Sequence, residues 1–100
     1  MSLPYVINLD EIKIEFSKKG RKQATRVFNK CYRLTVSTLN ENREGLTVRQ
    51  VSEITGRSIE IEEKYLESFH RVDLIEKSDQ TYKITDENLE KIENLFGVKL

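Results

Sequence analysis

The sequence predicts a mainly α-helical domain that carries one small β-hairpin. Apolar residues recur at helical spacing in four segments, the longest of them over residues 21–40. After Leu74 the spacing changes to alternation, and a polar run over residues 76–80 separates two β-prone stretches, as in a hairpin. The length of 100 residues suits one domain with a modest core. We therefore expect a single domain over residues 1–100.

Composition excludes several classes of protein. No apolar run approaches the length of a membrane span, and the first residues lack the basic-then-apolar order of a signal peptide. Cys31 is the only cysteine and His70 the only histidine, which excludes an intrachain disulfide and a cysteine-rich zinc site. We expect a cytoplasmic protein with no membrane contact, no metal and no cofactor.

Sequence motifs of catalysis are missing from the chain. It has no glycine-rich phosphate loop, no GxSxG, no HExxH and no CxxC. A catalytic pair of carboxylates also needs a cleft, which a small three-helix domain rarely has. The chain is therefore predicted not to be an enzyme.

The N-terminal third is predicted to form a strand and a long helix. Within residues 1–17, Ile12, Ile14 and Phe16 alternate with polar residues, which favours a strand used as a sheet edge or in a dimer. The helix over residues 21–40 has its apolar stripe at Ala24, Val27, Phe28, Cys31, Leu34 or Thr35, Thr38 and Leu39.

Residues 47–72 have the signals of two helices joined by a tight turn. Thr47 and Gln50 have the spacing of a capping box, Gly56 ends the first helix, and Ser58 is the N-cap of the second. The inward positions expected here are Val51 and Ile54, then Ile61 or Ile59, Leu66 and Phe69, with Tyr65 beside them and Val72 near the end.

The hairpin is expected over residues 74–85 and a last helix over residues 86–96. Thr85 is the predicted N-cap of this helix, and Gly97 ends it. Its apolar stripe is Leu89, Ile92, Leu95 and Phe96. The core is expected to contain Val27, Phe28, Cys31, Leu34, Val51, Ile54, Leu66, Phe69, Leu74 and Ile84.

The stretch LTVRQVSEITGRSIEIEEKYLESFHRVDLIEKSDQTYKIT, residues 46–85, resembles the winged-helix family of DNA-binding domains. The resemblance implies a winged helix-turn-helix fold with an extra N-terminal strand and a C-terminal helix. It implies a transcriptional regulator of the microbial or archaeal type, whose second motif helix enters the major groove of duplex DNA. The stretch ITDENLEKIENLF looks like the closing helix of many microbial repressors, which implies a homodimer.

Charge is unevenly distributed along the chain. Residues 1–33 hold eight basic and three acidic side chains, whereas residues 34–100 hold nine basic and fourteen acidic ones. Seven basic residues and no acid lie between Ser17 and Arg33, which favours contact with phosphates or an acidic partner. The candidate DNA contacts are Lys18, Lys19, Arg21, Lys22, Arg26, Arg49, Arg57, Lys64, Arg71 and Lys77.

A second hypothesis is a winged helix that contacts a protein in a transcription, replication or division assembly. The second motif helix carries Glu60, Glu62, Glu63 and Glu67, which DNA phosphates would repel. The arrangement of charge distinguishes the two hypotheses. DNA is favoured if the basic residues of 18–26 share a surface with Arg49, Arg57 and Lys64, and a protein partner is favoured if they do not.

Overall fold

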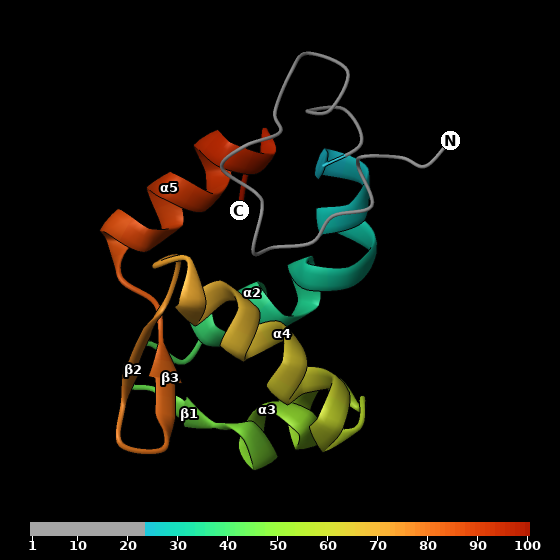
Figure 1. Ribbon diagram of the computed structural model, residues 1–100, viewed down its shortest axis with the longest axis vertical. Helices are drawn as coiled ribbons and strands as arrows, with labels where there is room; N and C mark the ends of the chain where they lie inside the picture. The colour runs from blue at the N-terminus through green and yellow to red at the C-terminus, as the bar shows by residue number, and fades with distance from the viewer. Residues whose placement is uncertain (1–23) are drawn as a thin grey trace.

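The computed structural model describes residues 24–100, of which 64% are helical. The helical segment 24–27 leads into a π-helical turn, Phe28–Tyr32, and then α2, Arg33–Asn40. The other elements follow in the order β1 (Leu46–Thr47), α3 (Val48–Thr55), α4 (Ile59–Arg71), β2 (Glu76–Ser78), β3 (Thr81–Lys83) and α5 (Asp86–Phe96). Figure 1 shows this arrangement. It confirms the predicted mainly α fold with a small β-element, and the predicted strand within residues 1–17 lies outside the described residues.

The π-helical turn changes which residues of the first helix face inward. The Arg33 N–H donates to the Phe28 carbonyl, five residues back, instead of four. One extra residue in the turn rotates the following residues, so that Tyr32 is buried and Cys31 is only half-buried. The buried face of this helix is Ala24, Phe28, Tyr32, Thr35, Val36, Thr38 and Leu39.

Three core predictions in the first helix are therefore wrong or only partly met. Leu34 is 47% exposed, because the stripe beyond the π-helical turn follows Val36 and Leu39. Val27 and Cys31 are partly buried and pack against the core. Periodic patterns assume a regular α-helix, so they do not anticipate the shift at the π-helical turn. Of the inward positions predicted after the turn, Leu34 is exposed, whereas its alternative Thr35 and the positions Thr38 and Leu39 are buried.

The two helices of the central unit begin and end at the predicted residues. Thr47 and Gln50 form the capping box of α3, and Gly56 follows α3 in the left-handed conformation. The hydroxyl of Ser58 accepts from the Ile61 N–H at the start of α4. Three residues, 56–58, thus separate the helices, and α3 and α4 pack against each other.

The inward faces of α3 and α4 differ from the prediction. Ile54 is 54% exposed, and α3 buries only Val51. In α4 the first inward side chain is Glu62, which is fully buried, while Ile59 and Ile61 are exposed. The expected inward positions Ile54 and Ile61 or Ile59 are therefore wrong. In α4 the reason is that the carboxylate of Glu62 occupies the inward position assigned to an apolar side chain.

The sheet joins the start of α3 to the hairpin. Its strand order is β1-β3-β2, and all pairs are antiparallel. Leu46 lies opposite Tyr82, and Ser78 lies opposite Thr81, so two residues form the hairpin turn. Asp79 in that turn has a φ of 56°. The predicted hairpin over residues 74–85 is confirmed.

Helix α5 follows the hairpin and packs Ile92 and Phe96 into the core. Thr85 and Asn88 form its capping box, and Gly97 follows it in the left-handed conformation, as expected. The Asn88 side chain also donates to Glu76 in β2, at 3.1 Å. The ring of Phe96 lies 4.8 Å from that of Phe28 and 5.9 Å from that of Phe69.

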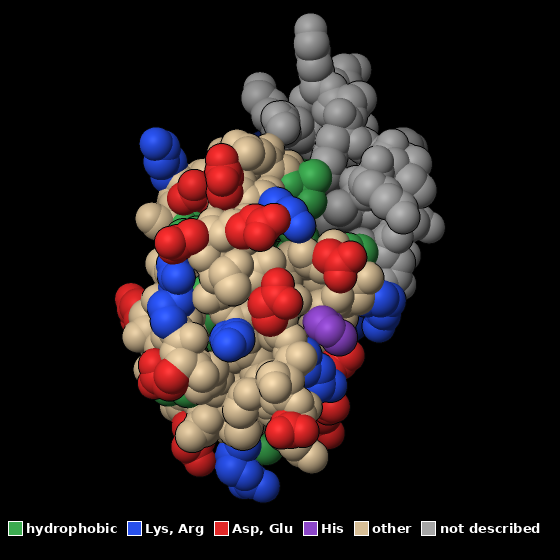
Figure 2. All heavy atoms as spheres, turned by 90° about the vertical axis from the view of Figure 1, so that its left-hand side faces the viewer, with side chains coloured by type: hydrophobic (Ala, Val, Ile, Leu, Met, Phe, Trp, Pro, Cys, Tyr) green, Lys and Arg blue, Asp and Glu red, His purple; other side chains and the backbone are tan. Residues whose placement is uncertain are grey.

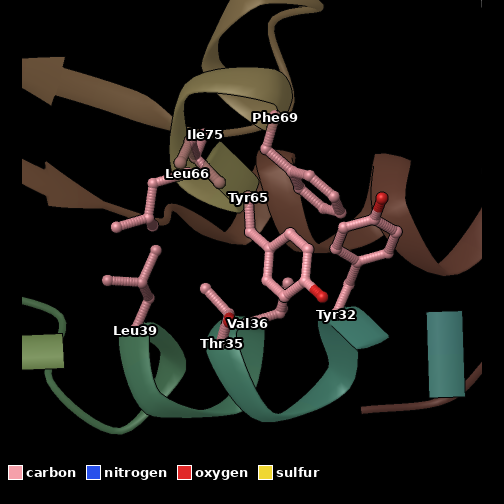
Figure 3. Close-up of a pocket in the computed structure, with 8 residues that line it drawn as sticks. All are labelled: Tyr32, Thr35, Val36, Leu39, Tyr65, Leu66, Phe69 and Ile75. Atoms are coloured by element: carbon pink, nitrogen blue, oxygen red, sulfur yellow. The ribbon is translucent and has the colours of Figure 1, made fainter. Parts of the chain in front are cut away.

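The contact between α2 and α4 is tightly filled. Figure 3 shows Tyr65, Leu66 and Phe69 of α4 directed towards Tyr32 and the side chains of α2. The small space between them admits no water-sized sphere. The core prediction is confirmed at Phe28, Val51, Leu66, Phe69, Leu74 and Ile84.

Candidate nucleic-acid interface

An open groove of about 510 Å³ lies between the start of α3, the start of α4 and the hairpin. The sheet order brings these three elements together, because β1 runs directly into α3 and pairs with the hairpin strand β3. The groove is lined by Thr47, Val48, Arg49, Ile59, Glu63, Lys77, Asp79, Gln80 and Tyr82. It therefore combines apolar, polar and charged side chains of both signs.

A cluster of three side chains fixes the hairpin to α4. Glu67 accepts from the Lys77 ammonium at 2.7 Å and also from the Tyr82 hydroxyl. The Lys77 ammonium also lies 5.0 Å from the centre of the Tyr82 ring. These contacts hold the position of the hairpin relative to α4 and occupy Lys77, one of the predicted DNA contacts.

The same cluster shifts the acid–base behaviour of its members. Hydrogen bonds from Lys77 and then from Tyr82 lower the pKa of Glu67 below its ordinary value. Burial, followed by the hydrogen bond to Glu67, raises the pKa of Tyr82. The hydrogen bond to Glu67 raises the pKa of Lys77. Glu67 and Lys77 therefore form an ionised pair at neutral pH.

Arg57, another predicted DNA contact, points into the molecule. Its Nε donates to Glu62 at 2.8 Å, its Nη1 to the Cys31 carbonyl at 2.9 Å and its Nη2 to the Thr35 hydroxyl at 2.7 Å. Its guanidinium also lies 5.1 Å from the centre of the Tyr65 ring. Arg57 thus connects the first helix, the α3–α4 turn and α4, and we assign it a structural role.

Glu62 is the buried partner that makes this arrangement stable. Its carboxylate accepts from the hydroxyls of Thr35 and Thr55, at 2.6 and 2.7 Å, in addition to Arg57. A fully buried carboxylate needs such partners, since it has lost its hydration. Nothing in the spacing of Arg57 and Glu62 distinguishes this pair from an exposed one, so the sequence carries no clear signal for it.

Two tyrosines flank this ion pair. The Tyr32 and Tyr65 rings meet edge to face at 4.7 Å. Burial raises the pKa of Tyr32 to about 12, and Cys31 and Tyr65 add to the increase. Burial also raises the pKa of Tyr65, with a further contribution from Cys31. Both hydroxyls are therefore neutral at physiological pH.

The remaining predicted contacts are spread over the molecule. Arg49 is exposed at the start of α3, Lys64 is exposed in the middle of α4, and Arg71 is exposed at the end of α4. Arg26 is exposed in the segment 24–27, which lies at the end of the molecule opposite to α3 (Figure 1). Lys18, Lys19, Arg21 and Lys22 lie outside the described residues.

The described surface has no concentrated positive field on the face seen in Figure 2, where acidic and basic side chains alternate. Over residues 24–100, no group of His, Cys, Asp and Glu is placed to hold a metal ion. No helix in this part of the chain combines the length and the apolar character that a membrane crossing requires.

Comparison of the chain with protein-family models, with curated proteins and with solved structures finds no match.

Proposed function

We propose that the chain is a winged-helix protein that binds duplex DNA as a transcriptional regulator. The observation that carries this proposal is the sheet order β1-β3-β2, in which the strand before α3 pairs with the hairpin strand β3. Together with the three-residue turn between α3 and α4, this topology places two helix starts and a hairpin around one groove. Winged-helix proteins use this combination to place a helix in the major groove.

In this proposal α4 enters the major groove and the hairpin lies along the adjacent backbone. Arg49 lines the groove, Lys64 is exposed on α4 next to the lining residue Glu63, and both are available to donate to phosphates. Glu60 and Glu63, also exposed on α4, oppose that attraction. We expect this face to position the protein on DNA and the seven basic residues between Ser17 and Arg33 to supply most of the electrostatic attraction.

The test is the salt dependence of binding to a random duplex, measured by fluorescence anisotropy. Replacing Arg49 and Lys64 with Ala should weaken binding and reduce the log–log salt slope by roughly two, about one for each lost phosphate contact. Lys91→Ala is the matched control, because Lys91 is an exposed lysine on α5. Equal slopes for the double variant and the control would contradict DNA binding through this face.

Contact with a protein partner is a second candidate. It is favoured by the pairing of Arg57 with Glu62 and of Lys77 with Glu67, which removes two cations from the set available to DNA. It is also favoured by the position of the segment 24–27, which contains Arg26 and lies at the end of the molecule opposite to α3 (Figure 1). Glu60→Gln distinguishes the candidates, since removing this exposed acid strengthens DNA binding only if α4 faces DNA.

A further inference from the structure

Two exposed residues of α4 face the groove one helical turn apart. Ile59 and Glu63 both line it, together with the start of α3 and the hairpin tip. Ile59 is 41% exposed, and it lines the groove, whereas the other exposed large aliphatic side chains among residues 24–100, those of Leu34, Ile54 and Ile61, do not. The spacing of four residues places the two side chains on the same face of the helix.

The carboxylate of Glu63 differs from those of Glu62 and Glu67 in having no partner among residues 24–100, and from that of the exposed Glu60 in lining the groove. Glu62 is buried against Arg57, and Glu67 pairs with Lys77. Glu63 is exposed and makes no hydrogen bond or ion pair within residues 24–100. An unpaired carboxylate on a DNA-facing helix is repelled by phosphates, so it is favourable only where it meets a donor on a base.

The chemistry of the major groove supplies a partner for each side chain. Cytosine presents its N4 amine, which a carboxylate accepts from, and thymine presents its C5 methyl group, which an aliphatic side chain contacts. Side chains four residues apart on a helix are about 5–6 Å apart at Cβ. Bases along one strand rise by about 3.4 Å per step, so the two side chains reach bases one or two steps apart.

We propose that Glu63 and Ile59 determine sequence preference by reading a cytosine and a nearby thymine in the major groove. Glu63 accepts a hydrogen bond from the cytosine N4 amine, and Ile59 packs against the thymine methyl. This inference rests on the proposed DNA binding and adds the identity of the bases. It also accounts for an acid and an exposed isoleucine at the start of the helix.

The first test selects bound duplexes from a random pool at moderate salt. The wild-type protein should enrich sites with a cytosine and a thymine within two positions of each other. Glu63→Gln should change the cytosine preference to adenine, because a glutamine side chain pairs with adenine N6 and N7. Glu60→Gln is the matched control: it removes an exposed acid of α4 that does not line the groove, so it should change affinity without changing base preference.

The second test measures the contribution of the methyl group directly. Deoxyuridine in place of the selected thymine lacks the C5 methyl and should weaken wild-type binding several-fold. Ile59→Ala should weaken binding to the thymine site by a similar factor and should no longer distinguish thymine from uracil. Both positions are exposed, so the variants are expected to fold, which circular dichroism checks.

The outcomes separate the inference from the proposed function. Tight binding without base preference, or a Glu63→Gln variant that retains the wild-type preference, would overturn the assignment of Glu63 and leave DNA binding in place. Equal loss on uracil substitution in the wild type and in Ile59→Ala would overturn the assignment of Ile59. Absence of wild-type binding to any duplex at low salt would overturn both the inference and the proposed function.

Discussion

Phe69 of α4 packs against three aromatic rings, and its position in the sequence does not predict these contacts. Its ring lies 5.1 Å from Tyr32, 5.9 Å from Phe96 and 6.5 Å from Phe28. Phe69→Ala should reduce the free energy of unfolding by about 3–5 kcal/mol, because the cavity cannot collapse among rigid rings. Urea denaturation measures the loss, and Ile54→Ala is the control, expected to stay within about 0.5 kcal/mol as a surface change. A loss below about 1 kcal/mol for Phe69→Ala would contradict its burial.

Asp73 occupies a position at the end of α4 that suits glycine better. Its φ is 62°, its N–H donates to the His70 carbonyl, and the next N–H, of Leu74, donates to the Phe69 carbonyl. This pair of bonds defines a Schellman motif, in which a left-handed residue without a Cβ is favoured. Asp73→Gly should therefore stabilise the protein by roughly 0.5–1 kcal/mol, as judged by the urea midpoint.

Gly56→Ala is the opposite change and provides the control for Asp73→Gly. Gly56 has a φ of 82°, and a Cβ built there would meet no atom within 4 Å. Any loss of stability in this variant comes from backbone strain alone, and we expect about 1 kcal/mol. A destabilised Asp73→Gly variant would show that the Asp73 side chain makes a contact that compensates its conformation.

At the scale of elements, the Glu67 cluster makes the hairpin sensitive to acid. The folded pKa of Glu67 lies below the ordinary value of 4.5, so its stabilising effect is present above that value. It is lost as the pH falls from about 4.5 through the folded pKa. The melting temperature of Glu67→Gln should therefore be lower than that of the wild type at pH 7, and the difference should shrink towards pH 3.

Thermal melts at several pH values between 7 and 3 check this prediction. Glu90→Gln is a suitable control, because Glu90 is exposed on α5. A constant difference between the wild type and Glu67→Gln over the whole range would contradict the role of the ionised carboxylate.

Helix ends and the hairpin could be predicted from the sequence because their signals are local. Thr47, Ser58 and Thr85 cap the helices at the expected residues, and the polar run 76–80 contains the turn. The Arg57–Glu62 pair could not be predicted, since it depends on how three helices meet. It also explains why Glu62 takes an inward position and Ile61 an outward one.

At the scale of the whole molecule, the sequence alone does not predict that the residues lining the groove lie together. Of the lining residues, Arg49 and Lys77 could be singled out by their charge, but the apolar lining by Ile59 and Tyr82 depends on how the helices and the sheet pack together. The N-terminal strand lies outside the described residues, and α5 packs its half-buried Leu89 and Leu95 against the core. The homodimer predicted from these two elements stays a prediction.

The charge of the basic segment should dominate non-specific binding. Replacing Lys18, Lys19, Arg21 and Lys22 with Ala should flatten the log–log salt slope by about three to four units, at roughly 0.9 for each phosphate contact. Anisotropy titrations from low to moderate salt measure it, with a Lys91→Ala, Lys99→Ala variant as control. An unchanged slope in the fourfold variant would move the proposal towards the protein-contact candidate.

The most direct test of DNA binding through the groove is a titration of the isotope-labelled protein with a short duplex, followed by amide resonances in NMR. Among residues 34–100, we expect the largest shifts in three segments at the groove, residues 47–50, 59–64 and 77–81. Resonances of α5 beyond its first turn should change little. Shifts confined to α5, or no shifts at low salt, would contradict the account.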